Sequence, residues 1–306
     1  MSRTSPRTMT SKEWLMMFGL SLLWGSSFLL IKYALKGFQP FSIVLVRVVV
    51  ASVVLWSILR WQGKKLPHDK KIWRDFFVIS LINNVIPFSI IMWSETQISS
   101  GLTSVLNASA PLWTVILALA LRAEQVTWNR IIGVIFGFTG VIVMIGFSSL
   151  EGFGLHILAQ VGMLLATLCY ALAGQYTQRL KALEPNTIAT GQVLCSSIIM
   201  LPVVALADKP WLQPMPSASS WAAVIALGVL GTAVAYLLYF RILLSAGPGN
   251  ALLVTFIIPV NAVLLGIIVL GETFAPYQFG GMFLILLGLL AVDGRVFRFR
   301  KTQPSA

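Results

Sequence analysis

Ten long apolar stretches dominate the chain, and only short hydrophilic gaps separate them. A helix needs about 20 apolar residues to cross the hydrocarbon core of a membrane, and these stretches are of that length. Barrel strands would instead alternate apolar and polar residues over about ten positions. The sequence therefore predicts an all-α integral membrane protein with ten transmembrane helices. Their predicted ranges are 14–35, 40–60, 73–94, 99–121, 127–147, 155–178, 187–207, 219–244, 249–270 and 274–292.

The basic residues predict the orientation of these helices. Only 10% of the 306 residues are charged, compared with about a quarter in soluble domains, and the net charge is +12. With the N-terminus inside, 18 of the 22 Lys and Arg residues fall on the inner side and three on the outer side. This distribution follows the positive-inside rule. We expect a multi-pass protein of the bacterial inner membrane with both termini in the cytoplasm, and no nucleic-acid partner.

The chain also matches itself at a shift of 148 residues. Because the repeating unit holds five predicted helices, an odd number, the second copy enters the membrane upside down. Inverted repeats are common in secondary transporters, whose substrate site lies near the membrane midplane between the copies. The predicted divisions are a tail at 1–13, a first repeat at 14–147, a second, inverted repeat at 148–293, and a tail at 294–306. The aligned pairs are Gly101 with Gly249, Pro111 with Pro259, Glu124 with Glu272, Gly133 with Gly281, and Gly140 with Gly288.

Several segments, in order, resemble the drug/metabolite transporter superfamily and, within it, the ten-helix metabolite exporters of the EamA type. They include WGSSFLLIKYAL, GLTSVLNASAPLWTVILALALRAE, ATLCYALAGQYTQRL, GTAVAYLLYF and PVNAVLLGIIVLGE. The resemblance extends over about residues 14–292. It implies a carrier for small organic solutes, including amino acids, that commonly exports them.

Prolines inside the predicted helices indicate where a substrate could bind. A proline removes a backbone donor and frees a carbonyl group, and in lipid such groups must face protein or a watery cavity. Asn107 and Pro111 share one helix face, as do Thr255 and Pro259. We predict that these four residues line a central cavity, the alternative being polar contacts between packed helices. Pro87 has two neighbouring amides, Asn83 and Asn84, between which the pattern does not decide; Asn84 is taken as the candidate.

A basic residue and several aromatic residues complete the candidate substrate site. Arg47 lies within the second predicted helix and is interpreted as an attractor for a substrate carboxylate; a snorkelling cation is the alternative. Lys32 lies nearer the outer surface and carries the same two interpretations. Aromatic side chains away from the helix ends suit apolar or aromatic substrates, and the candidates are Trp24, Tyr170, Tyr236 and Tyr239.

Acidic residues are absent from the middle of the predicted helices. All ten lie near helix ends or in loops, whereas a proton-coupled carrier normally has a titratable group in its pathway. Glu95, at the outer end of the third helix, is the best of the weak candidates. The sequence therefore favours facilitated diffusion or exchange.

Glycines at 133, 137 and 140, and again at 281 and 288, allow close helix approach and indicate a scaffold rather than a site. A monomer or weak homodimer is expected.

Taken together, the sequence predicts a secondary carrier for amino acids or related metabolites, working by alternating access with no cofactor and no metal. Enzymatic activity is not expected, because paired membrane histidines, Asp clusters and a Walker A segment are all missing from the sequence. The alternatives are a proton-coupled drug or metabolite efflux carrier, a flippase for lipids or lipid-linked substrates, and a channel.

Overall fold

A computed structural model describes residues 9–120, 128–145, 154–246, 248–251 and 253–293. Within these ranges the chain is helical and has no strand. Seven helical segments are long and apolar enough to span a membrane, and three further apolar helices are shorter. Residues 1–8 of the predicted tail at 1–13, the predicted tail at 294–306, and Glu124 of the repeat comparison lie outside the described residues.

The helices follow the order of the predicted apolar stretches, but several stretches are divided into two. Their bounds are α1 Ser11–Ala34, α2 Pro40–Trp61, α3 Lys70–Ser80, α4 Ile86–Ser94, α5 Ser100–Asn107, α6 Ala110–Ala120, α7 Trp128–Ile145, α8 Leu155–Thr177, α9 Pro185–Ala207, α10 Ala218–Gly228, α11 Ala235–Ala246, α12 Pro248–Ala251, α13 Val254–Leu270 and α14 Pro276–Asp293.

Two of the divided stretches are joined by wider, π-helical turns. The first, η1 (Leu81–Val85), links α3 to α4, and the second, η5 (Val229–Val234), links α10 to α11. Pro87 has no N–H to donate to the carbonyl of Asn83, which accounts for the wider register before it. The two π segments begin 148 residues apart, the spacing at which the sequence matches itself. Such segments often mark functional sites.

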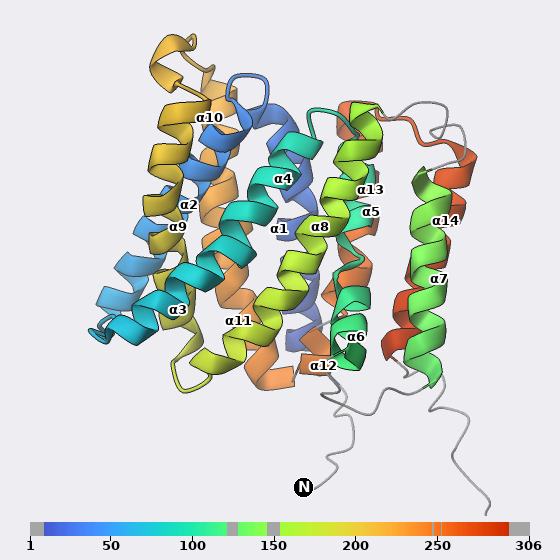
Figure 1. Cartoon of the computed structure of the whole chain (residues 1–306), viewed down its shortest axis with the longest axis horizontal. Helices are drawn as coiled ribbons and strands as arrows, with labels where there is room; N and C mark the ends of the chain where they lie inside the picture. The colour runs from blue at the N-terminus through green and yellow to red at the C-terminus, as the bar shows by residue number, and fades with distance from the viewer. Residues whose placement is uncertain (1–8, 121–127, 146–153, 247, 252, 294–306) are drawn as a thin grey trace, which may run out of the picture.

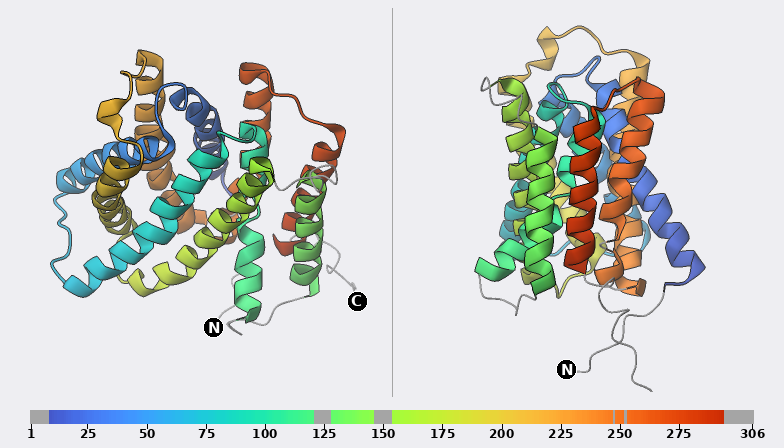
Figure 2. Two further views of the ribbon diagram at one scale, coloured as in Figure 1. Left: turned by 45° about the horizontal axis from the view of Figure 1, so that its top comes forward. Right: turned by 90° about the vertical axis from the view of Figure 1, so that its right-hand side faces the viewer.

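The helices run side by side, and their connections gather at two ends (Figure 1). The end drawn at the top of Figure 1, called the upper end from here on, carries the connections 35–39, 95–99, 208–217 and 271–275. The opposite, lower end carries the connection from α2 to α3. α7 and α14 pack against each other at one edge of the bundle, as Figure 2 shows.

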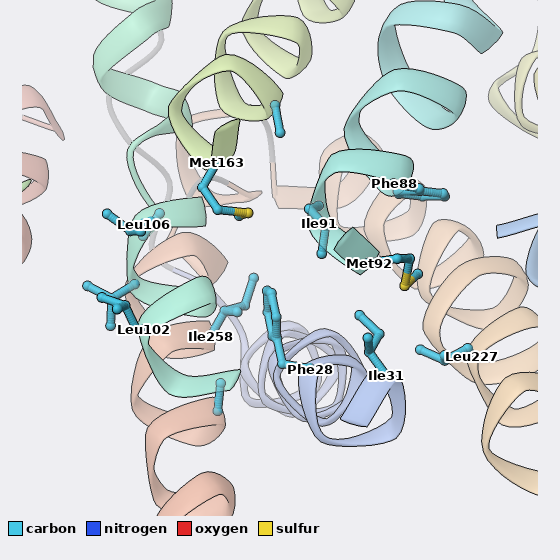
Figure 3. Close-up of a cluster of buried hydrophobic side chains, with 14 of the residues drawn as sticks. Phe28, Ile31, Phe88, Ile91, Met92, Leu102, Leu106, Met163, Leu227 and Ile258 are labelled. Carbon is cyan, nitrogen blue, oxygen red and sulfur yellow. The ribbon is translucent and has the colours of Figure 1, made fainter. Parts of the chain in front are cut away.

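Apolar side chains from many helices meet between α1, α4 and α5 (Figure 3). Phe28 and Ile31 of α1 face Met92 of α4, while Leu106 of α5 and Met163 of α8 close the other side. Because lipid is as apolar as these side chains, close van der Waals packing is what holds such helices together.

Two carboxylates bind the starts of helices at the upper end. Asp208 accepts hydrogen bonds from the backbone N–H of Ser42 (2.6 Å) and from its hydroxyl (2.7 Å). Glu272 accepts from the backbone N–H groups of Ser100 (2.7 Å) and Gly101 (3.1 Å). Each carboxylate satisfies donors that a helix start leaves free and complements the helix dipole. Asp208 thus joins α9 to α2, and Glu272 joins the end of α13 to α5.

The glycines of α7 and α14 allow these two helices to approach closely. A Cβ atom at Gly140 would lie 2.6 Å from the carbonyl oxygen of Gly281 and 2.8 Å from the backbone nitrogen of Ile285. Both are backbone atoms, so relief requires the helices to separate. This contact agrees with the scaffold role predicted for these glycines.

Gly140→Ala is therefore expected to destabilise the protein by about 1–3 kcal/mol, the usual cost of overpacking. Thermal unfolding of the purified protein in detergent measures this as a lower melting temperature. Gly280→Ala is the matched control, because a Cβ atom there would meet nothing within 4 Å. Equal melting temperatures for the two variants would contradict this account of the contact.

Candidate functional site

Asn84, in the first π segment, lies at the centre of a buried hydrogen-bond network. Its Nδ2 donates to Oγ of Ser196 on α9 over 3.0 Å, and its Oδ1 accepts from the hydroxyl of Tyr236 on α11 over 3.1 Å. Asn84 is fully buried. Asn83 donates from Nδ2 to Oε1 of Gln192 on α9 over 3.0 Å. Both neighbouring amides therefore contact α9. Asn84 also bonds to Tyr236 on α11.

Arg47 makes the corresponding contact with the second π segment. Its Nε donates to Oγ1 of Thr232 over 2.8 Å, and Nη2 lies 3.5 Å from the carbonyl oxygen of Gly231. The guanidinium carbon stands 3.9 Å from the centre of the Phe88 ring, a cation–π distance. Arg47 is 6% exposed, so its guanidinium is enclosed by protein.

The two networks share a pattern along the chain. Asn84 and Thr232 are 148 residues apart, one in each π segment, and both are fully buried. Arg47 and Gln192 each stand seven positions after the proline that opens their helix, Pro40 in α2 and Pro185 in α9. Each of these two side chains contacts the π segment that lies in the other half of the chain. The two networks therefore each join a π segment of one half of the chain to a long helix of the other half.

These matching positions differ in charge. Arg47 supplies a cation where Gln192 supplies a neutral amide. The ion pairs among the described residues are Lys64–Glu184 and Arg74–Asp75, so neither engages Arg47. A buried charge is costly unless it is paired. The Arg47 guanidinium is therefore not paired with a carboxylate among the described residues.

Aromatic rings lie beside this network. Trp24 on α1 and Tyr239 on α11 have ring centres 5.6 Å apart, and Phe240 contacts both Tyr239 and Tyr236. Tyr170 on α8 is half-buried and packs against the main apolar core. The structure thus brings three of the four predicted aromatic residues into one group around α11.

The fourth apolar stretch is broken next to Asn107. Residues 108–109 form a turn between α5 and α6, and Pro111 stands in the first turn of α6, where a missing N–H is tolerated. Oδ1 of Asn107 and Nε1 of Trp113 are buried without a hydrogen-bond partner. Broken membrane helices are typical of transporter substrate sites, so these two unpaired groups are further candidates.

The remaining predicted residues lie on α13. Thr255 precedes Pro259 by about one turn, and Pro259 is buried inside the helix. α13 packs on α1, where Nδ2 of Asn261 donates to Oγ of Ser21 over 3.0 Å. A Cβ at Gly25 would lie 3.3 Å from the carbonyl oxygen of Ile258. This close approach places the part of α13 around Ile258 beside α1.

Three partners in the networks were not predicted from sequence: Gln192, Ser196 and Thr232. All three are polar residues within long apolar stretches, and this feature alone could have indicated them from the sequence. Among the described residues no group of three His, Cys, Asp or Glu side chains is suited to hold a metal ion.

The helices, their polar centre and the comparisons together identify the class of protein. A model of the EamA-like transporter family matches the chain twice, at residues 11–146 and 157–292. The protein is a multi-pass membrane protein of the transporter class. It belongs to the EamA-like transporter family, part of the drug/metabolite transporter superfamily.

Similar proteins extend over nearly the whole chain. An uncharacterized transporter from Archaeoglobus fulgidus is 25% identical, covering 92% of this chain and 98% of its own length. The uncharacterized inner membrane transporter YedA of Escherichia coli K12 is 22% identical over 90% and 89% of the two chains. Protein PecM of Dickeya dadantii is 25% identical over 92% and 93%. One solved crystal structure shares the fold with a TM-score of 0.68 at 17% identity, covering 96% of this chain and all of the other.

Proposed function

We propose that this protein is a secondary carrier that exports amino acids or related carboxylate-bearing metabolites. The observation that carries the proposal is the buried Arg47 side chain. Its hydrogen-bond partners, Thr232 and Gly231, belong to the other half of the chain, and it forms no ion pair with a carboxylate among the described residues. A substrate carboxylate accepts from a guanidinium through charge-assisted bonds.

In this proposal the substrate binds between the two π segments. Arg47 holds its carboxylate, and Asn84 with Tyr236 supplies neutral hydrogen-bonding groups. Trp24, Tyr170 and Tyr239 contact its apolar part, and Asn107, Pro111, Thr255 and Pro259 form the walls at the two proline-containing helices.

The mechanism that we propose is alternating access by two inverted five-helix repeats, at 14–147 and 148–293, that together make ten membrane helices. One family model matches the chain twice, at positions 146 residues apart, which supports the repeats. The two π segments, which begin 148 residues apart, support them as well. The upper end then faces outward and both termini face the cytoplasm of a bacterium, as the positive-inside rule requires. The carrier works as a monomer or weak homodimer, by facilitated diffusion or exchange.

Release of amino acids from living cells tests this proposal. Cells that express the protein are fed dipeptides, which raise internal amino-acid levels, and each amino acid in the medium is measured over time. We expect faster release of a subset of amino acids than from cells expressing Arg47→Met at equal membrane abundance. Identical release of all amino acids by the two strains would refute amino-acid export.

A further inference from the structure

Glu95 lies buried at the upper end, and its carboxyl group makes no hydrogen bond to any described residue. It follows the last residue of α4, and its side chain is 1% exposed. Both carboxyl oxygens are buried, and neither has a hydrogen-bond partner among the described residues. An ionised carboxylate in such a place would be very costly, so the group neutralises instead.

The charged neighbours of Glu95 are already engaged elsewhere. Nζ of Lys32 on α1 donates to the backbone carbonyl oxygens of Glu95 (2.5 Å) and Ile98 (2.7 Å). Glu272, beyond the end of α13, accepts from the backbone of α5. Arg47 on α2 bonds to the second π segment. These are the charged groups that act on Glu95.

Burial raises the pKa of Glu95 well above its usual range, and the negative charge of Glu272 adds to this rise. Lys32 and Arg47 oppose it, but burial is the larger effect. The direction agrees with the geometry, in which the oxygens lack any donor that would stabilise the ionised form.

We propose that Glu95 is a proton-binding site, and that its proton keeps α1 tied to the turn between α4 and α5. While Glu95 is neutral, Lys32 bonds to the two carbonyl oxygens of that turn. An ionised carboxylate in this buried place has no hydrogen-bond donor among the described residues, so release of the proton to water favours a form in which the turn moves away from α1 and Glu95 meets water. The contacts of Lys32 with the turn are then lost, and the upper end opens.

The sign of the pH effect follows from linkage. The closed form holds the proton more tightly than an open form in which Glu95 meets water. Opening is therefore disfavoured at low pH and becomes easier as pH rises from the usual pKa of a glutamate to its raised value. Above that value pH has no further effect. Because one proton is involved, the open population changes by at most about tenfold per pH unit.

Infrared difference spectra test the site itself, without any transport. Purified protein in lipid is titrated, and the carbonyl band of a protonated carboxylic acid is followed. We expect a band that persists to higher pH than that of an exposed glutamate in the wild type and in His156→Gln, and that is missing from Glu95→Gln. Identical spectra for the wild type and Glu95→Gln would overturn the proposal.

Exchange in proteoliposomes tests the effect of the proton. The vesicles hold unlabelled amino acids, a labelled amino-acid mixture is added outside, and pH is equal on both sides. Exchange by the wild type is expected to rise with pH and then level off. Glu95→Gln should be slow at every pH, and Lys32→Met should be fast at every pH, because its α1 contact is gone.

His156→Gln is the matched control, since His156 is an exposed titratable residue at the start of α8. It should keep the pH response of the wild type. A wild-type response in Glu95→Gln would overturn the proposal. This assay rests on the proposed function, whereas the infrared experiment does not. A wild type that exchanges no amino acid would therefore count against the proposed function alone, and the infrared band would decide for Glu95.

Discussion

Replacing Arg47 with methionine is expected to reduce amino-acid exchange by about 10- to 100-fold while the protein still folds. A hydrogen bond to a charged group contributes about 1.5–3 kcal/mol, and each 1.4 kcal/mol is a factor of ten in affinity. Methionine fills much of the same space and retains contact with the Phe88 ring, on which the guanidinium now stacks. The loss should therefore appear in substrate affinity rather than in the amount of folded protein.

Two further variants identify which property of Arg47 matters. Arg47→Lys keeps the charge but lacks the planar group that bonds Thr232 and stacks on Phe88, so an intermediate loss is expected. Arg241→Met removes an exposed cation from α11 and should have no effect. Loss of folded protein in Arg47→Met, in parallel with its loss of exchange, would instead assign Arg47 a purely structural role.

Asn84→Leu is expected to lower both stability and exchange. The substitution removes the acceptor of the partly buried Tyr236 hydroxyl and the donor to Ser196, whose own hydroxyl still donates to the carbonyl of Gln192. An unsatisfied buried polar group costs about 1–3 kcal/mol. The melting temperature should fall, and exchange should fall further than the loss of folded protein explains, because the first π segment loses the Asn84 contacts with α9 and α11 and keeps only that of Asn83 with Gln192.

Combining this change with Tyr236→Phe shows whether the network acts as a unit. If Asn84 and Tyr236 act through their shared hydrogen bond, the double variant should be no less stable than Asn84→Leu alone. Additive losses in melting temperature would show that the two residues contribute independently and would contradict the proposed network.

Much of the fold follows from features that a sequence carries openly. Apolar length predicts the order of the helices, although several of the predicted stretches are divided into two. Pro87 and Pro111 lie next to two of these divisions, whereas Pro259 lies inside the unbroken helix α13. At Pro87 the chain widens into a π segment, whereas before Pro111 it breaks into a turn. The second π segment has no proline within it, so the sequence indicates it only through the shift of 148 residues from the first.

The contacts between distant residues could not be predicted in the same way. Arg47 stands out in an apolar helix, but its partner Thr232 is one hydroxyl among many and lies 185 residues away. No residue near Gln192 in the sequence indicates its contact. The contact with Asn83 forms because α9 packs against the first π segment. The sequence indicates Glu95 as the best of the weak acidic candidates for a titratable group in the pathway. Its burial could not be predicted, because it depends on helices brought together from across the chain.

The central claim is that the substrate is carried by its carboxylate from a site between the two halves. Counterflow in proteoliposomes tests it most directly, by comparing uptake of a labelled amino acid with uptake of the same amino acid as its carboxyl amide. The account predicts saturable uptake of the acid, stimulated by unlabelled acid inside, and little uptake of the amide. Equal uptake of both, or uptake that never saturates, would contradict the account.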